Sequence, residues 1–169
     1  NNNINENKLT KENNLGTLTI NSEDLSDTNK ANNKSVVVLD NLSPAEKFQK
    51  AFDLLRSQKF EDSKLAFQEF IASNQDNDFS GSAHYWLGEI YLLEKNYLEA
   101  ALVFAEGYQK YSESVKAPDM LYKLSESFVN LNKIKDACNT LLKFSQEYPN
   151  HSLVKKSLDK KIELNCINI

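Results

Sequence analysis

The chain has 169 residues, a net charge of −4 at neutral pH and a pI near 5.3. This acidic balance disfavours a surface that binds nucleic acid or anionic lipid. No apolar run reaches the roughly 20 residues of a membrane helix, so the sequence predicts no membrane insertion. Because the chain begins at Asn1 rather than at Met, we expect a mature or truncated form whose signal peptide has been removed.

Residues 1–43 differ in composition from the rest of the chain. They are crowded with Asn, Ser, Thr and Lys, lack helical periodicity, and hold two short apolar stretches, at 15–20 and 36–39. Such a segment buries too little apolar surface to offset the entropy of ordering it. We therefore predict a disordered polar linker. The alternative is that the 36–39 stretch docks on the first hairpin or pairs as a short strand.

A capping box is predicted to start the first helical hairpin. Ser43 is a suitable N-cap, Pro44 suits the first turn, and Glu46 lies three residues after Ser43. Helices are expected over residues 44–56 and 60–73. The second of these is expected to pack through its apolar residues, Leu65, Phe67, Phe70 and Ile71.

The second hairpin, residues 81–111, carries the clearest pattern in the chain. Its large apolar and small residues fall at the offsets of a tetratricopeptide repeat (TPR), two helices joined by a tight turn. These residues are Tyr85, Leu87, Gly88, Tyr91, Tyr97, Ala100 and Phe104. Because one such hairpin cannot bury both of its apolar faces, it requires neighbouring hairpins.

This pattern recurs every 37 residues, which predicts three hairpins. Phe48, Tyr85 and Tyr122 are spaced by this interval. Two columns of small residues, which let paired helices approach, follow the same spacing: Ala51, Gly88 and Ser125, then Ser63, Ala100 and Ala137. The interval exceeds the usual TPR length of about 34 residues, so we expect about three extra residues in each connection between hairpins.

The third hairpin is predicted to begin at Pro118, and its second helix, residues 134–148, to end before Pro149. Ser152 is expected to cap a last helix. That helix is expected to cover the third hairpin through Leu153, Leu158 and Ile162.

These elements predict an all-α fold, a TPR α-solenoid of three helical hairpins plus a C-terminal capping helix, preceded by the linker. The domain is expected to span residues 44–169. Its expected parts are repeats at about 44–77, 81–114 and 118–151 and a capping helix at 152–165.

Residues suited to catalysis or metal binding are few. His84 and His151 lie in different repeats, and a metal site would need more ligands than these. Glu89 and Glu126 occupy equivalent positions on first helices, where a role in partner binding explains them better than acid–base catalysis. The sequence contains no glycine-rich phosphate loop and no nucleophile motif. We therefore predict no catalytic, cofactor or metal site, and a protein-binding role.

Several short motifs together carry a more specific resemblance. They are Tyr85-Trp86-Leu87-Gly88-Glu89, Lys116-Ala117-Pro118-Asp119, Asp136-Ala137-Cys138 and Tyr148-Pro149. At these intervals they resemble the C-terminal TPR domain of the YbgF/CpoB family, the cell division coordinators associated with the Tol-Pal system, over residues 44–166. Three positions depart from the family pattern: Lys95 replaces a turn glycine, Ser125 a glycine of the third repeat, and Ser112 a proline.

The resemblance implies a periplasmic adaptor without enzymatic activity. Family members have a signal peptide, a trimerising coiled coil, a polar linker and this domain. Residues 1–43 would match the linker, and the intact protein would be a homotrimer through a coiled coil outside this chain. The implied partners are TolA and a class A penicillin-binding protein. The implied role of the adaptor is to coordinate outer-membrane constriction with septal peptidoglycan synthesis during cell division. Two alternatives stay open, a TPR scaffold of outer-membrane protein assembly and a generic peptide-binding TPR module.

We predict that the partner segment binds in the concave groove that the first helices of a TPR array line. The repeat alignment selects these groove positions: Phe52, Arg56, Tyr85, Glu89, Leu92, Tyr122, Glu126 and Val129. For Tyr85 and Tyr122 the alternative is that they pack between hairpins.

A disulfide is expected between Cys138, near the start of the second helix of the third repeat, and Cys166, at the end of the capping helix. The oxidising periplasm that the resemblance implies would favour this pairing. The alternative is two separate thiols, with Cys138 buried as a small apolar residue.

Overall fold

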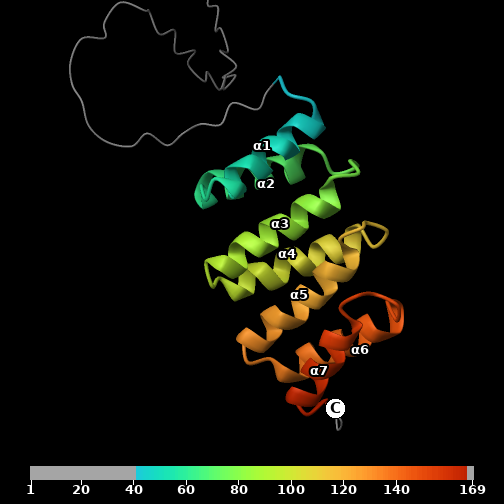
Figure 1. Cartoon of the computed structure of the whole chain (residues 1–169). Helices are drawn as coiled ribbons and strands as arrows, with labels where there is room; N and C mark the ends of the chain where they lie inside the picture. The colour runs from blue at the N-terminus through green and yellow to red at the C-terminus, as the bar shows by residue number, and fades with distance from the viewer. Residues whose placement is uncertain (1–40, 167–169) are drawn as a thin grey trace, which may run out of the picture. The chain divides into compact units, whose positions relative to one another are not determined.

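A computed structural model describes residues 41–166 of the chain. The prediction of a disordered linker falls almost entirely on residues 1–40, which lie outside the described residues, as do residues 167–169. Within residues 41–166 the regular secondary structure is helical throughout (Figure 1). The helices are α1 (Pro44–Arg56), α2 (Phe60–Ser73), α3 (Ser80–Leu93), α4 (Tyr97–Lys110), α5 (Ala117–Asn130), α6 (Ile134–Glu147) and α7 (Val154–Glu163).

The predicted capping box is present at the start of α1. The backbone N–H of Ser43 donates to a carboxylate oxygen of Glu46 at 2.8 Å, and the backbone N–H of Glu46 donates to the Ser43 hydroxyl at 3.4 Å. Pro44 stands in the first turn, where a helix needs no backbone donor. These bonds satisfy groups that a helix start otherwise leaves without partners, which explains why α1 begins here.

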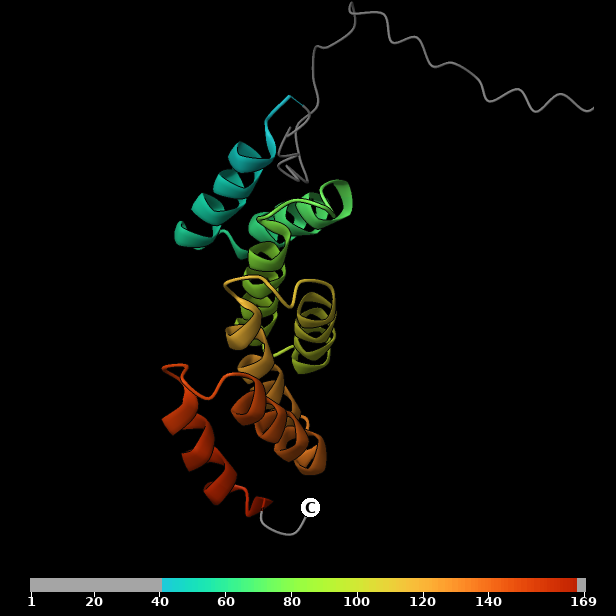
Figure 2. The same cartoon turned by 90° about the vertical axis from the view of Figure 1, so that its right-hand side faces the viewer.

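The helices pack as consecutive hairpins. α1 contacts α2, α3 contacts α4 and α5 contacts α6, and each hairpin contacts the next through α2 with α3 and α4 with α5. α7 packs on α6 at the C-terminal end, and Figure 2 shows the hairpins following one another along the array. This arrangement confirms the predicted TPR solenoid of three hairpins plus a C-terminal helix. No helix in the described part of the chain combines the length and hydropathy that a membrane crossing needs.

Two clusters of buried side chains hold the hairpins together. Their largest fully buried members are Phe67, Phe70 and Ile90 in the first cluster and Phe104, Tyr122 and Phe144 in the second. Gly88 lets the ring of Phe104 lie directly against α3, because a Cβ at Gly88 would overlap that ring. This close approach explains why a small residue occupies this column of the repeat alignment.

The prediction that Leu65 belongs to the core face of α2 is wrong, because its side chain is 41% exposed. α2 buries Ser63, Ala66, Phe67 and Phe70 instead. Residues two apart on a helix point in widely different directions, so Leu65 cannot share a face with Phe67. Leu65 therefore lies on the outward side of the helix.

The last helix, α7, also differs from its prediction. Leu153 rather than Ser152 is the N-cap, without a side-chain hydrogen bond to the helix. The helix packs on the third hairpin through Leu153, Val154 and Leu164 and buries Ser157, whereas Leu158 and Ile162 are 45% and 73% exposed. The latter two point to a side of α7 that no other helix of residues 41–166 covers.

The predicted disulfide is present between Cys138 of α6 and Cys166. The Cα atoms of the two residues are 5.5 Å apart, and 28 positions separate them in the sequence. The disulfide ties the segment after α7 to the second helix of the third hairpin.

The turns inside the three hairpins share one backbone conformation. Gln58, Lys95 and Asn132 have φ values of 58°, 59° and 57°, and they are spaced by the 37-residue repeat. Side chains crowd the backbone in this left-handed region, at a cost of roughly 1–2 kcal/mol that glycine avoids. The conformation of this turn therefore favours glycine at the position that Lys95 occupies.

Replacing Lys95 by glycine is expected to raise the free energy of unfolding by about 0.5–1 kcal/mol, because the relief of strain exceeds the extra chain entropy of glycine. The matched variant Asn132→Gly should gain less, since asparagine tolerates this conformation better than lysine. Urea unfolding at neutral pH measures both. A lower stability for Lys95→Gly would contradict this account of the turn.

Candidate functional site

All eight predicted groove residues lie on the first helices of the hairpins, α1, α3 and α5. These helices follow one another down the array (Figure 2), and α3 and α5 also contact each other. Side chains from consecutive repeats are thus brought onto one continuous surface, as a TPR groove requires.

The N-terminal part of this surface is aromatic. The ring of Phe52 on α1 lies 5.0 Å from the ring of Trp86 on α3, centroid to centroid, and both side chains are half-buried. Arg56, one turn further along α1, is exposed and lies 3.8 Å from Asp53. Trp86 was part of a motif in the sequence but was not among the predicted groove residues.

Tyr85 continues this aromatic surface on α3. The ammonium group of Lys116 lies 4.6 Å from the centroid of the Tyr85 ring and 5.9 Å from that of Trp86. Burial, together with the nearby carboxylate of Glu89, raises the pKa of Tyr85 to about 12. The Tyr85 hydroxyl therefore keeps its proton at neutral pH and can donate a hydrogen bond to a ligand.

Lys123 of α5 lies between the two predicted glutamates. Its Nζ is 3.1 Å from Oε1 of Glu89 and 3.2 Å from Oε2 of Glu126, and Lys156 of α7 is 3.6 Å from the other Glu126 oxygen. Burial raises the pKa of Glu89, with Lys123 acting in the opposite direction. Burial lowers the pKa of Lys123, but the two carboxylates more than offset it and leave the pKa above its ordinary value.

This row of alternating charges spans α3, α5 and α7. The raised pKa of Lys123 keeps its ammonium group charged at neutral pH, so charges of both signs lie side by side on this surface. Such a surface can pair with both signs of charge on a ligand.

Three of the predicted groove residues converge in one cavity. Leu92 of α3 and Glu126 and Val129 of α5 line a surface cavity of about 320 Å³. The other lining residues are Tyr97, Asn130 and Lys160, contributed by α4, α5 and α7. The cavity thus combines apolar walls with a carboxylate and an ammonium group, a composition that suits an amphipathic peptide.

Tyr122 does not present an aromatic anchor, which corrects that part of the prediction. Its side chain is 1% exposed, and its ring lies 6.0 Å from that of Phe144 on α6. The ammonium group of Lys156 on α7 lies 5.0 Å from the Tyr122 ring centroid. Tyr122 therefore packs between the third hairpin and α7. The alternative was right that its ring is packed, but it named neighbouring hairpins rather than the capping helix.

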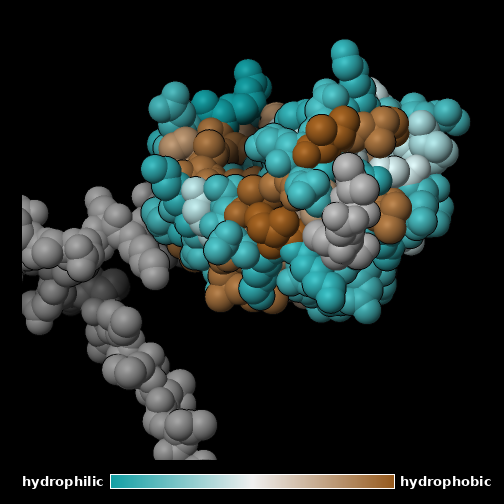
Figure 3. Space-filling view, turned by 90° about the horizontal axis from the view of Figure 1, so that it is seen from below, coloured by the Kyte–Doolittle hydropathy of each residue, from teal (hydrophilic) through white to brown (hydrophobic). Residues whose placement is uncertain are grey.

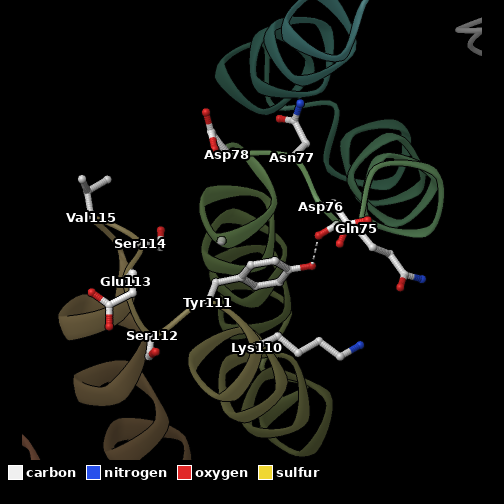
Figure 4. Close-up of a pocket in the computed structure, with 11 residues that line it drawn as sticks. Gln75, Asp76, Asn77, Asp78, Lys110, Tyr111, Ser112, Glu113, Ser114 and Val115 are labelled. Atoms are coloured by element: carbon white, nitrogen blue, oxygen red, sulfur yellow. Dashed lines mark hydrogen bonds between the residues drawn. The ribbon is translucent and has the colours of Figure 1, made fainter.

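A second cavity, of about 520 Å³, lies between the connections that follow the first two hairpins (Figure 4). Tyr111 extends across it, and its hydroxyl donates a hydrogen bond of 2.8 Å to the backbone oxygen of Gln75. Gly81 is needed there because a Cβ would overlap Ser114. From the sequence we expected only extra residues in these connections, and no motif in them indicated a cavity. This cavity therefore belongs to the contact between the first two hairpins' connections and is separate from the groove.

The two histidines pack in different places. His84 of α3 is 1% exposed, with Nδ1 2.8 Å from the Ser80 backbone oxygen, whereas His151 lies against the ring of Phe144. Among residues 41–166 no group of three or more His, Cys, Asp and Glu side chains is arranged to hold a metal ion. His84 is thus a core residue of the second hairpin.

The burial of His84 predicts a pH-dependent stability. Burial lowers the pKa of His84 below its ordinary value of 6.5, so the unfolded chain binds a proton more readily than the folded one. We therefore expect the free energy of unfolding to fall as the pH falls below about 6.5. Urea unfolding at pH 7.5 and pH 5 measures this change. His84→Leu, which follows Leu121 in the repeat alignment, should show a smaller change, and an equal change in both proteins would contradict the assignment.

Comparison with known proteins agrees with the fold. The tetratricopeptide repeat family model matches residues 119–151. The structure is similar to the Yersinia enterocolitica type III secretion chaperone SycD, crystallised in complex with a peptide of the translocator YopD. The two share 17% sequence identity with a TM-score of 0.57, over 71% of this chain and 87% of that one. None of the curated proteins matches this chain.

Proposed function

We propose that this domain binds a peptide segment of a partner protein in the groove along α1, α3 and α5. The observation that carries the proposal is the cavity in which Leu92, Glu126 and Val129 of consecutive repeats meet Lys160. Repeat-equivalent positions that converge on one cavity are expected of a ligand surface, whereas core positions would be buried. The SycD complex supports the proposal because that similar fold was crystallised with a peptide.

The chemistry of the groove favours a peptide with both apolar and charged residues. Its N-terminal part offers the rings of Phe52, Trp86 and Tyr85, and its C-terminal part offers the Glu89–Lys123–Glu126 charge row. Aromatic side chains supply large contact areas at low entropic cost, and alternating charges fix the register of the ligand.

For the partner itself we propose a segment of TolA, in a periplasmic adaptor of the Tol-Pal system that acts in cell division. The support is the resemblance of the YWLGE, KAPD, DAC and YP motifs to the YbgF/CpoB family. The disulfide of Cys138 and Cys166 also suits an oxidising compartment such as the periplasm. In this reading a class A penicillin-binding protein is a second partner, and the intact protein trimerises through a coiled coil outside this chain.

The test is a calorimetric titration of purified TolA segments against the wild type and two matched double variants. Leu92→Ala with Val129→Ala removes the apolar walls of the cavity, and should weaken binding about tenfold or more. Leu98→Ala with Leu102→Ala removes two exposed leucines of α4 outside the cavity, and should leave the affinity unchanged. Circular dichroism and urea unfolding check that each variant is folded.

Two results would contradict the proposal in different ways. If TolA segments bind and the cavity variant retains full affinity, the binding site lies outside this groove. If no TolA segment binds the wild type, the Tol-Pal assignment is wrong for this domain.

A further inference from the structure

The last helix is held to the array by one covalent bond and few buried side chains. Ser157 is the one fully buried residue of α7, while Leu158 and Ile162 point outward. A helix of ten residues is not stable alone in water, so its order depends on docking. The disulfide from Cys138 to Cys166 follows α7 by three residues and fixes its C-terminal end to α6.

α7 also completes the proposed binding site. Its Lys156 lies 3.6 Å from Glu126 and 5.0 Å from the centroid of the Tyr122 ring, and its Lys160 lines the cavity with Leu92. The end wall of the groove is therefore a helix whose C-terminal end is tied to α6 by a disulfide.

We propose that the Cys138–Cys166 disulfide is a reducible clasp that controls the end of the groove. When the disulfide is formed, α7 covers Tyr122 and contributes Lys160 to the lining of the cavity. When it is reduced, α7 detaches, Tyr122 becomes exposed and the cavity loses Lys160. The regulation of peptide binding by this clasp rests on the proposed function, whereas the movement of α7 does not.

The two cysteines of the bridge differ in their exposure. Cys138 is 3% exposed, whereas Cys166 lines a surface cavity of about 370 Å³ with Leu158, Lys161 and Ile162. Hydrophobic patches also lie on this end of the domain (Figure 3). A dithiol reductant of the thioredoxin type can therefore approach Cys166 through this cavity, whose lining includes the apolar side chains of Leu158 and Ile162.

The reduction proceeds by thiol–disulfide exchange. A thiolate of the dithiol attacks Sγ of Cys166, the Sγ–Sγ bond breaks, and Cys138 leaves with the electron pair and takes a proton. In the mixed disulfide, the first sulfur of the reductant is bonded to Sγ of Cys166. The second thiolate of the reductant attacks that first sulfur and releases Cys166, which is protonated in turn. Two electrons and two protons pass from the dithiol to the cystine, and the reductant leaves as a disulfide.

Hydrogen exchange of the full chain tests the movement of α7. On reduction the amides of α7 should exchange on the order of a hundredfold faster, while those of α3 should change little. Cys166→Ala, which keeps the buried Cys138 in place, should behave like the reduced wild type. Equal protection of α7 in the oxidised and reduced proteins, and in the variant, would overturn the clasp.

A trapping experiment tests the site of attack. A thioredoxin whose second cysteine is replaced by serine should form a mixed disulfide with the folded chain, and peptide mapping should place it on Cys166. A mixed disulfide on Cys138, or none with the folded chain, would overturn the proposed route of reduction.

The binding consequence is tested with the TolA segments in the presence and absence of a dithiol. Affinity should fall at least tenfold on reduction, and unchanged affinity would overturn the regulatory role. If the segments bind neither form, the function proposed above fails, while hydrogen exchange still decides whether the disulfide holds α7.

Discussion

Replacing Phe104 by alanine should lower the free energy of unfolding by about 3–5 kcal/mol. The ring of Phe104 is fully buried in the cluster that joins the second and third hairpins, and it fills the space beside Gly88. Its removal leaves a cavity that helices on both sides cannot close without moving. Guanidinium unfolding followed by circular dichroism measures the loss.

Leu102 is the matched control for this prediction. It lies on the same helix two residues earlier and is 56% exposed, so Leu102→Ala should cost about 0.5 kcal/mol or less. A loss below about 1 kcal/mol for Phe104→Ala would show that this cluster does not hold the hairpins together.

Gly88 provides an independent test of the same contact. Gly88→Val should destabilise the wild type by about 1–3 kcal/mol, because any Cβ at this position overlaps the Phe104 ring. In the Phe104→Ala background the same change should cost much less, since the ring is gone. Additive effects in this double-mutant cycle would contradict direct packing between the two positions.

The repeat spacing explains why much of the fold was predictable. A residue in one hairpin has a similar environment to its equivalents 37 positions away, so the pattern of the paired helices appears three times in the sequence. The small residues of one alignment column, Ala51, Gly88 and Ser125, are buried in all three hairpins. The start of α1 was predictable for another reason, since a capping box is a local interaction between Ser43 and Glu46.

The errors concern positions whose environment depends on a helix outside the repeat pattern. Leu158 and Ile162 were assigned to the packed side of α7, but that assignment depends on how the last helix docks. Tyr122 is buried because α7 covers it, although its equivalent Tyr85 is only half-buried. Leu65 is different, because its distance of two residues from Phe67 already placed it on another face.

The repeat alignment predicted part of the lining of one cavity. Leu92 and Val129 line the same cavity because they occupy equivalent positions on successive first helices, and Glu126 lies one turn before Val129 on α5. Lys123 was missed, although it lies one turn before Glu126 and the repeat places it beside Glu89. Lys160 could not be assigned, because its place in the cavity depends on the docking of α7.

Removing the disulfide should have the second large effect on stability. The double variant Cys138→Ala, Cys166→Ala should unfold with a free energy lower by about 3 kcal/mol, because the bridge closes a loop of 28 residues in the unfolded chain. Alanine keeps the small apolar volume of Cys138, which is nearly buried in α6, so little of the loss should arise from packing. Guanidinium unfolding without reductant measures the difference from the oxidised wild type.

A reductant separates the contribution of the bridge from that of the cysteine side chains. The wild type in excess dithiol should fall to the stability of the double variant, whereas the double variant should be unaffected by the dithiol. Unfolding of the reduced protein should begin at the C-terminal end of the domain. Terminal elements of a repeat array have only one neighbour, and α7 has few buried side chains of its own. Equal stability of the oxidised and reduced wild type would mean that packing alone holds α7, and that the bridge adds nothing to the fold.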